Sequence, residues 1–223
     1  MTLDLDFHST LYLIGLIAVF VFALTGALAA AKRELDILAF VFVGIVTGIG
    51  GGTIRDLLLR TDQIFWIADP NYLTVCIFAS VMTYFFAHWV IKIDRILLWM
   101  DAAGIALFAV LGTSKALSYE VAPLIAILMG VISSTLGSAI RDLMLQVKLV
   151  IFEPEIYVTA CLLGSLSYVV LSHFGINEVY NILLSSGAAF LLRVLAIELD
   201  LRFPSFTLSK LQNREIRKQQ HKS

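Results

Sequence analysis

Seven long apolar segments, separated by short polar stretches, account for most of the chain. Each segment is long enough to cross the hydrocarbon core of a bilayer, which is about 30 Å thick, as an α-helix. The pattern therefore predicts an all-α polytopic membrane protein with seven transmembrane helices. The predicted helices cover residues 11–31, 37–59, 72–91, 96–117, 121–145, 156–174 and 179–199.

Charged residues and prolines mark the gaps between these segments. Acidic and basic residues gather at positions 32–36, 92–95 and 148–155. Every proline lies at or near a predicted helix end, where its missing N–H donor disturbs a helix least. The prolines are Pro70, Pro123, Pro154 and Pro204.

The composition excludes a soluble domain that is built around a single core. Of 223 residues, 59% are hydrophobic and 15% are charged, and the mean hydropathy is +0.90. The net charge of −1 does not indicate a polyionic partner, so we expect no nucleic acid. Asp4 and Asp6 precede the first apolar segment and no basic residue does. Because a signal peptide needs a basic start, we expect this segment to be a true span.

The distribution of basic residues predicts the orientation in the membrane. With the N-terminus outside, the inner loops and the tail at 202–223 carry most lysines and arginines, whereas the outer loops keep only Arg60 and Lys115. The positive-inside rule then favours an outer N-terminus and a cytoplasmic C-terminus. We also expect the basic tail to be attracted to anionic membrane lipids.

The chain repeats itself. A shift of 86 positions aligns residues 54–57 (Ile-Arg-Asp-Leu) with residues 140–143, and after one deleted loop residue a shift of 85 aligns Cys76 with Cys161. Each repeat holds three spans, which is an odd number, so the second repeat crosses the membrane in the opposite sense. The predicted units are a first three-helix repeat (1–95), a second, inverted repeat (96–175), a seventh transmembrane helix (176–201) and a basic cytoplasmic tail (202–223).

The second apolar segment holds five glycines and an Arg-Asp pair. A glycine costs a helix about 1 kcal/mol against alanine, and a charge at bilayer depth costs about 3 kcal/mol, so the segment needs a compensating role. Gly44, Gly48 and Gly52 recur at every fourth position, which favours close helix packing. Gly50 and Gly51 lie on other faces, and three consecutive glycines predict a break in the helix. A phosphate-binding loop is the weakest alternative, since no Gly-Lys-Ser/Thr ending follows.

The second repeat replaces several of these glycines by hydroxyl residues. Gly130, Ser134 and Ser138 keep a small residue at every fourth position. Such hydroxyls commonly bond back to carbonyl groups of their own helix. The sharper hypothesis is that they join freed carbonyls as oxygen ligands of a passing cation. The other small residues around them are Ser133, Thr135 and Gly137.

The two Arg-Asp pairs lie within predicted spans. Arg55 and Asp56 are adjacent, so their side chains leave a helix about 100° apart, and we expect their partners to come from elsewhere. One arrangement pairs Arg55 with Asp142 and Asp56 with Arg141 across the repeats. The alternative is that each arginine extends to its own interface while each aspartate caps or pairs locally.

Two further charges are candidates for gating or for a pore mouth. Lys115, near the outer end of the fourth span, is either an interfacial lysine or a charge beside a pore. Arg193, in the last span, either extends inward to the interface or pairs with an acid such as Asp142.

The cysteines and histidines carry weaker signals. Cys76 and Cys161 form neither a disulfide nor a metal pattern, and we interpret them as packing residues. His88 and His173 lie near predicted helix ends, where interfacial anchoring is favoured over proton relay.

The doubled motif resembles the prokaryotic branch of the trimeric intracellular cation (TRIC) channel family. Its two copies are Gly-Ile-Gly-Gly-Gly-Thr-Ile-Arg-Asp at 48–56 and Ser-Thr-Leu-Gly-Ser-Ala-Ile-Arg-Asp at 134–142. The likeness extends over residues 11–199, and the same bacterial domain is also known as a glycine transporter domain. The Lys-Glu-Val motif of the animal members is absent from the second helix.

The resemblance implies a homotrimer in the inner membrane of a prokaryote, with one pore in each subunit for potassium and sodium ions. The second and fifth helices, broken at their glycines and serines, would line this pore. The only metal is then a monovalent cation in transit, and no cofactor is expected. The candidate ion path comprises Gly48, Gly50, Gly51, Gly52, Thr53, Arg55, Asp56, Ser133, Ser134, Thr135, Gly137, Ser138, Arg141 and Asp142.

Other classes of function fit the sequence less well. A secondary transporter for a small amino acid such as glycine is the alternative, because a carboxylate would meet an arginine or a half-helix N-terminus. The sequence alone does not separate this carrier from a channel. A scaffold gives no reason for paired charges within the membrane. An enzyme is least favoured, since no zinc motif, nucleophile elbow or cofactor fingerprint occurs.

Overall fold

The computed structural model describes residues 2–90, 94–152 and 156–202, and across these ranges the regular structure is helical. The predicted tail at 203–223 lies outside the described residues. The helices are α1 (Thr2–Ala31), α2 (Ile37–Leu59), α3 (Phe65–Ala68), α4 (Asn71–Val90), α5 (Asp94–Ser118), α6 (Pro123–Met144), the 3₁₀ helix η1 (Val150–Phe152), α7 (Val158–His173) and α8 (Glu178–Glu198).

Each of the seven helices that the hydrophobic pattern predicts is present, and α2 has the predicted bounds. The first helix begins at Thr2 rather than near residue 11. Five of the helices, α1, α2, α5, α6 and α8, are long and apolar enough to cross a membrane, whereas the apolar parts of α4 and α7 are shorter. The sequence analysis missed α3 and η1, because a single turn is too short to show a hydrophobic period.

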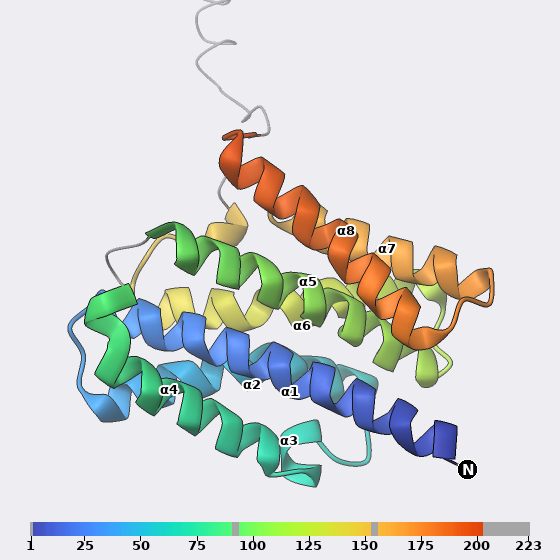
Figure 1. Cartoon of the computed structure of the whole chain (residues 1–223), viewed down its shortest axis with the longest axis horizontal. Helices are drawn as coiled ribbons and strands as arrows, with labels where there is room; N and C mark the ends of the chain where they lie inside the picture. The colour runs from blue at the N-terminus through green and yellow to red at the C-terminus, as the bar shows by residue number, and fades with distance from the viewer. Residues whose placement is uncertain (1, 91–93, 153–155, 203–223) are drawn as a thin grey trace, which may run out of the picture.

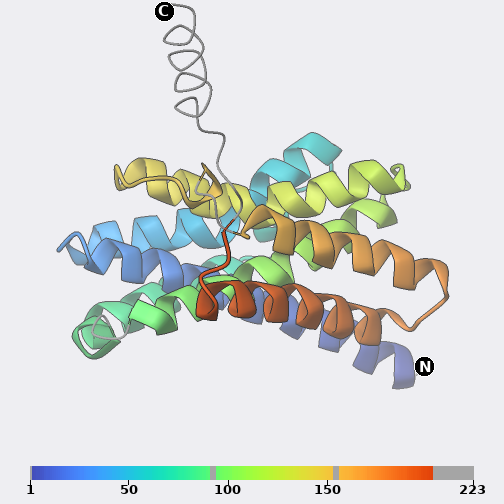
Figure 2. The same ribbon diagram turned by 90° about the horizontal axis from the view of Figure 1, so that it is seen from above.

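The helices pack side by side as a bundle. In Figure 1, α1 lies between α4 and α5, and it contacts both of them as well as α2. The two glycine- and serine-rich helices, α2 and α6, contact each other. The helices α7 and α8 form an adjacent pair at one side, as Figures 1 and 2 both show.

Local chemistry fixes several helix ends. Asp36 precedes α2 and accepts a hydrogen bond from the Ala39 backbone N–H at 2.8 Å, which satisfies one of the free donors of the first turn. Two loop geometries recur 86 positions apart. Glu34 and Glu120 have φ angles of 54° and 57°, and Arg60 and Gln146 have φ angles of 53° and 51°.

Small residues bring α1, α2 and α4 together, and the same set recurs in α5, α6 and α7. A side chain added at Gly44 would meet the Ala23 carbonyl oxygen and the Ser80 hydroxyl. A side chain added at Gly130 would meet the Ala109 carbonyl oxygen and the Ser165 hydroxyl. These residues are 85 or 86 positions apart in the chain. Close backbone approach is what small residues contribute to helix packing in a membrane.

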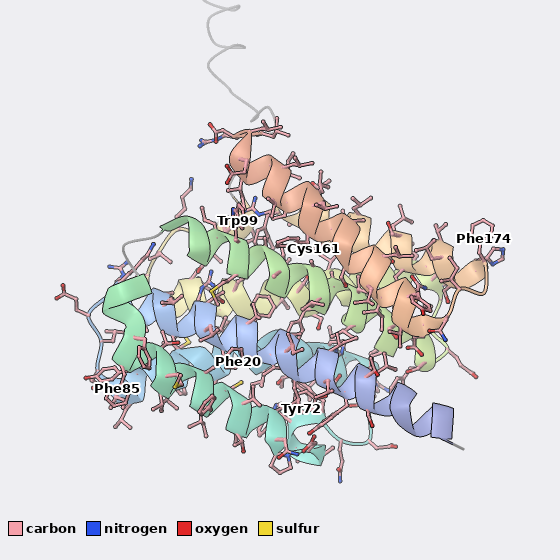
Figure 3. The ribbon with its side chains drawn as sticks, viewed as in Figure 1. Phe20, Tyr72, Phe85, Trp99, Cys161 and Phe174 are labelled. Carbon is pink, nitrogen blue, oxygen red and sulfur yellow. The ribbon has the colours of Figure 1, made fainter. Side chains whose placement is uncertain are left out.

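Apolar side chains fill the centre of the bundle, and others cover its outside. Phe22 of α1 and Phe108 of α5 are both buried, and their ring centroids lie 4.9 Å apart. Many large apolar side chains remain exposed, such as Leu38 at 77% and Phe174 at 74%, and Figure 3 shows Phe174 at the edge of the bundle. An exposed apolar surface of this extent is typical of a protein that faces lipid.

The helix α2 is continuous through Gly50, Gly51 and Gly52, so the predicted break is wrong. The helix α6 is likewise continuous through Gly137. Both helices retain their own backbone hydrogen bonds, which is the arrangement that costs least within a bilayer. The glycines allow the two helix backbones to approach each other closely, and they do not unwind either helix.

Two glycines form the crossing of α2 and α6. A Cβ atom added at Gly51 would collide with the Ser133 carbonyl oxygen, and one added at Gly137 would lie 2.5 Å from the Thr47 carbonyl oxygen. The two backbones therefore touch, and no side chain fits between them. The stripe of Gly44, Gly48 and Gly52 packs on other neighbours, among them the Cys76 sulfur and the Phe65 ring.

We expect the substitution Gly51→Ala to destabilise the protein by about 1 to 3 kcal/mol, the usual cost of overpacking. The matched control is Gly187→Ala in α8, where an added Cβ meets nothing within 4 Å. This control should raise stability, because alanine is the better helix former. The measurement is the thermal unfolding midpoint of each purified variant in detergent. Equal midpoints for the two variants would contradict the contact at the crossing.

Candidate functional site

Two cavities lie at opposite ends of the bundle. The first cavity has a volume of about 400 Å³ and the second about 240 Å³. Gly15 of α1 lines the first and Ala29 of the same helix lines the second, which separates them by about 21 Å at 1.5 Å per residue. Charged residues line both: Arg55, Lys115 and Glu178 in the first, and Lys32, Arg33, Asp101, Arg141, Asp142 and Arg193 in the second.

At the first cavity, Asp56 is the centre of a charge cluster. Its Oδ1 atom accepts hydrogen bonds from Arg55 Nε at 2.9 Å and Nη2 at 2.7 Å. Its Oδ2 atom accepts from Lys115 Nζ at 2.8 Å and from the Phe65 backbone N–H at 2.9 Å. Asp56 is 1% exposed and Arg55 is 5% exposed. Four donors therefore stabilise the carboxylate in a place where an unpaired charge would be very costly.

Phe65 covers this cluster with its ring. The Arg55 guanidinium carbon and the Lys115 ammonium nitrogen lie 5.8 and 5.9 Å from the ring centroid, within the range of cation–π attraction. Tyr72 packs edge-on against the same ring with a centroid distance of 5.0 Å, and Figure 3 shows Tyr72 beside α3. Gly52 leaves room for the ring, because an added Cβ would lie 2.7 Å from it.

The second cavity contains a related cluster around Asp142. Its Oδ1 atom accepts from Arg141 Nε at 2.9 Å and lies 2.8 Å from Nη2. Its Oδ2 atom accepts from the Val150 backbone N–H at 3.3 Å, as Asp56 does from Phe65. The two clusters differ in the charged residue that α5 contributes. In the first cluster it is Lys115, which contacts Asp56, and in the second it is Asp101, whose carboxylate lies 3.3 Å from Arg141.

Each arginine pairs with the aspartate that follows it, so our expectation that neighbours cannot satisfy each other is wrong. Because Arg55 pairs with Asp56 and Arg141 with Asp142, the cross-pairing of Arg55 with Asp142 and of Arg141 with Asp56 is also wrong. Neither arginine extends to the interface, since both are buried. The arginine side chain is long enough to bend along its own helix until its guanidinium reaches the neighbouring carboxylate. The expectation considered only the directions of the Cα–Cβ bonds, which are about 100° apart.

A hydrogen bond between side chains connects α2 and α6 at the crossing. Arg55 Nη1 of α2 donates to the Ser133 hydroxyl of α6 at 3.3 Å. The other hydroxyls near the crossing bond back to their own helices. Thr47 donates to the Val43 carbonyl oxygen at 2.7 Å, and Thr53 to the Ile49 carbonyl oxygen at 2.7 Å.

In α6 the same back-bonding holds for three candidate residues, Ser134, Thr135 and Ser138. Ser138 also lies 2.9 Å from the Tyr157 hydroxyl. In this conformation the hydroxyls therefore bond back to carbonyl groups of their own helix, the first of the two hypotheses drawn from the sequence. The oxygen atoms still carry lone pairs that can accept a cation.

Arg193 of α8 also lines the second cavity. It is 2% exposed, so it does not extend to the interface, and its guanidinium carbon lies 5.1 Å from the centroid of the buried Tyr157 ring. Lys115 has a 27% exposed side chain and faces the first cavity. Both candidate gating charges therefore line a cavity.

The cysteines are buried and unpaired with each other, and they belong to the apolar core, as predicted. The exposed His173 packs edge-on against Phe174 at the end of α7. The side chain of His88 lies outside the described residues. Among those that are described, no group of three or more His, Cys, Asp or Glu side chains could hold a metal ion.

Four residues of the two cavities and their clusters were not predicted from the sequence: Asp101, Glu178, Phe65 and Tyr157. Asp101 had a visible signal, because it is an acid inside an apolar run. Tyr157 aligns with Tyr72 at the 85-residue shift, which indicated a matched role. Phe65 and Glu178 gave no signal, since their positions depend on how a loop and the last helix fold back on the bundle.

Comparison with known proteins places this arrangement in a family. A family model described as "Glycine transporter" matches the chain at residues 12–88 and 98–173. A UPF0126 membrane protein of Vibrio cholerae is 36% identical over 206 residues, which are 91% of this chain and 85% of that protein. The UPF0126 inner membrane protein YadS of Escherichia coli K12 is 33% identical over 204 residues, 89% of this chain and 97% of that protein.

A solved structure agrees with the sequence matches. The TRIC trimeric intracellular cation channel orthologue from Rhodobacter sphaeroides is 42% identical, with a TM-score of 0.83, and the match covers 86% of this chain and 100% of that chain. The structural neighbours are channels and not enzymes. The chain is a membrane protein and belongs to the trimeric intracellular cation channel family.

Proposed function

We propose that this protein is a passive channel for monovalent cations, potassium and sodium. It works as a homotrimer with one pore in each subunit, and α2 and α6 line that pore. The observation that carries the proposal is the pair of charged cavities, the first lined by Arg55 of α2 and the second by Arg141 and Asp142 of α6. A solved relative that is 42% identical is named a trimeric intracellular cation channel.

The crossing would be the narrowest part of the path. Gly51 and Gly137 leave backbone oxygen atoms of Thr47 and Ser133 at the contact, and hard cations prefer oxygen ligands. An ion would shed part of its water in one cavity, pass these oxygens when the helices separate slightly, and regain water in the other. The candidate path from Gly48 to Asp56 and from Ser133 to Asp142 follows this seam.

The charge pairing favours monovalent over divalent ions. Divalent ions such as calcium bind groups of carboxylate and carbonyl oxygens. Asp56 and Asp142, the two aspartates of the candidate path, are each already bound by an arginine. The passing ion therefore meets carbonyl and hydroxyl groups rather than an open carboxylate cluster.

We further propose seven spans arranged as a 3+3 inverted repeat with α8 as the seventh. Support comes from the family model, which matches two stretches of the chain, and from the paired Asp56–Phe65 and Asp142–Val150 contacts. In this arrangement the N-terminus is outside and the second cavity, with Lys32 and Arg33, faces the cytoplasm. We keep the predicted boundaries of its units: 1–95 and 96–175 for the two repeats, 176–201 for the seventh helix and 202–223 for the tail.

A carrier for a small zwitterion such as glycine is the second candidate. The family model bears the description of a glycine transporter, and the first cavity is lined by two cationic side chains and by the Glu178 carboxylate. Glycine would place its carboxylate near Lys115 and its ammonium group near Glu178. Saturable uptake of labelled glycine into proteoliposomes, in protein that carries no ionic current, would favour this carrier over the channel.

Purified protein in planar bilayers with a potassium gradient should give discrete openings that reverse near the potassium equilibrium potential. The variants Arg55→Gln and Arg141→Gln should change the conductance, because each removes the counter-charge of a buried aspartate. Size-exclusion chromatography of each variant checks that assembly is kept. A wild-type protein that is silent under all voltages would overturn the channel.

Neutralising Asp56 or Asp142 should lower cation conductance by at least about threefold, because it removes a negative charge that offsets the cationic side chains around the path. The comparison variants are Cys76→Ala, at a residue that lines neither cavity, and His88→Gln. The measurement is single-channel conductance in symmetric potassium chloride. Equally small effects in all four variants would refute the assignment of the path.

A further inference from the structure

We infer that Glu178, in the first turn of α8, gives the first cavity its preference for cations over anions. This inference rests on the proposed channel function and adds a residue from outside the duplicated helices. Glu178 lines the first cavity together with Arg55 and Lys115. The seventh helix thus contributes to ion selection and not only to packing.

The Glu178 carboxylate is held in a fixed place by two neighbouring helices. The Ser114 hydroxyl of α5 donates to its Oε1 atom at 2.8 Å. The Tyr168 hydroxyl of α7 donates to Ser114 Oγ at 3.0 Å and lies 3.5 Å from the same carboxylate oxygen. Oε1 is the carboxylate oxygen that accepts from Ser114, which leaves Oε2 to meet water or an ion in the cavity.

The charges of the first cavity balance only when Glu178 is counted. Asp56 offsets one of the two cations, Arg55 and Lys115, and its two oxygens are occupied by four donors. Without Glu178 the cluster would carry one net positive charge, which repels an approaching cation. No ion pair among the described side chains includes Glu178, so its charge acts on the cavity itself.

A purely structural role for Glu178 is the competing explanation. An acid in the first turn of a helix is favoured by the helix dipole, by about 0.3 to 1 kcal/mol. That role needs neither Ser114 nor the cavity, and Asn177 already caps α8 by accepting from the Val179 N–H at 3.1 Å. The two explanations differ in their dependence on salt and on the direction of current.

The test compares Glu178→Gln with the wild type in planar bilayers. At about 0.01 M potassium chloride, where the Debye length is about 30 Å, the variant should pass less cation current from the first-cavity side. The cation current should fall about two- to threefold, because one charge about 8 Å away in water changes the local cation concentration by about that factor. At about 1 M salt the difference should vanish, and the reversal potential in a salt gradient should shift towards that of chloride.

The matched control is Glu198→Gln, the same change of charge at the other end of α8, at a residue that lines neither cavity. A second variant, Ser114→Ala, keeps the charge and should retain cation selectivity. The inference is overturned if Glu178→Gln passes the same cation current as the wild type at low salt. It is also overturned if the variant loses current equally in both directions and at high salt, with a lower unfolding midpoint, because that result indicates a structural role. A silent wild type would instead overturn the proposed function, and this inference with it.

Discussion

The contact of two helix backbones at Gly51 and Gly137 is the constraint on which the rest of the structure depends. It brings α2 and α6 close enough for Arg55 to reach the Ser133 hydroxyl of the opposite helix. It also fixes where the two Arg-Asp pairs lie, beyond the crossing in each direction. Arg55 of α2 lines the first cavity, and Arg141 and Asp142 of α6 line the second.

The buried charges of the two Arg-Asp pairs are tolerated inside this bundle because each one is paired with a nearby group of opposite charge. Each aspartate binds the arginine beside it and the backbone N–H of a following turn, from α3 or from η1. Removing one partner of such a buried pair leaves an uncompensated charge, which costs about 3 to 5 kcal/mol. Short helical turns that look incidental in the sequence therefore stabilise the charged ends of α2 and α6.

The two ends of the bundle are related in backbone but different in charge. The helix α5 places Lys115 at one end and Asp101 at the other, so one cluster gains a cation and the other an anion. The helix α8 adds Glu178 to the first and Arg193 to the second. A pathway with unlike ends conducts unequally in the two directions when salt is low, since screening is weak there.

The sequence by itself determined the membrane class, the seven helices, with the start of α1 as the largest error in their bounds, and the family, because hydrophobic length and short motifs are local properties. It also pointed to Arg55, Asp56, Arg141 and Asp142 as the charges that need partners. Only the tertiary structure decided that the glycines pack rather than break the helix, and that neighbouring arginine and aspartate pair. It alone brought Phe65, Asp101 and Glu178 to the cavities. Those outcomes depend on which helices approach each other and how closely, and on the bending of long side chains, which no single segment encodes.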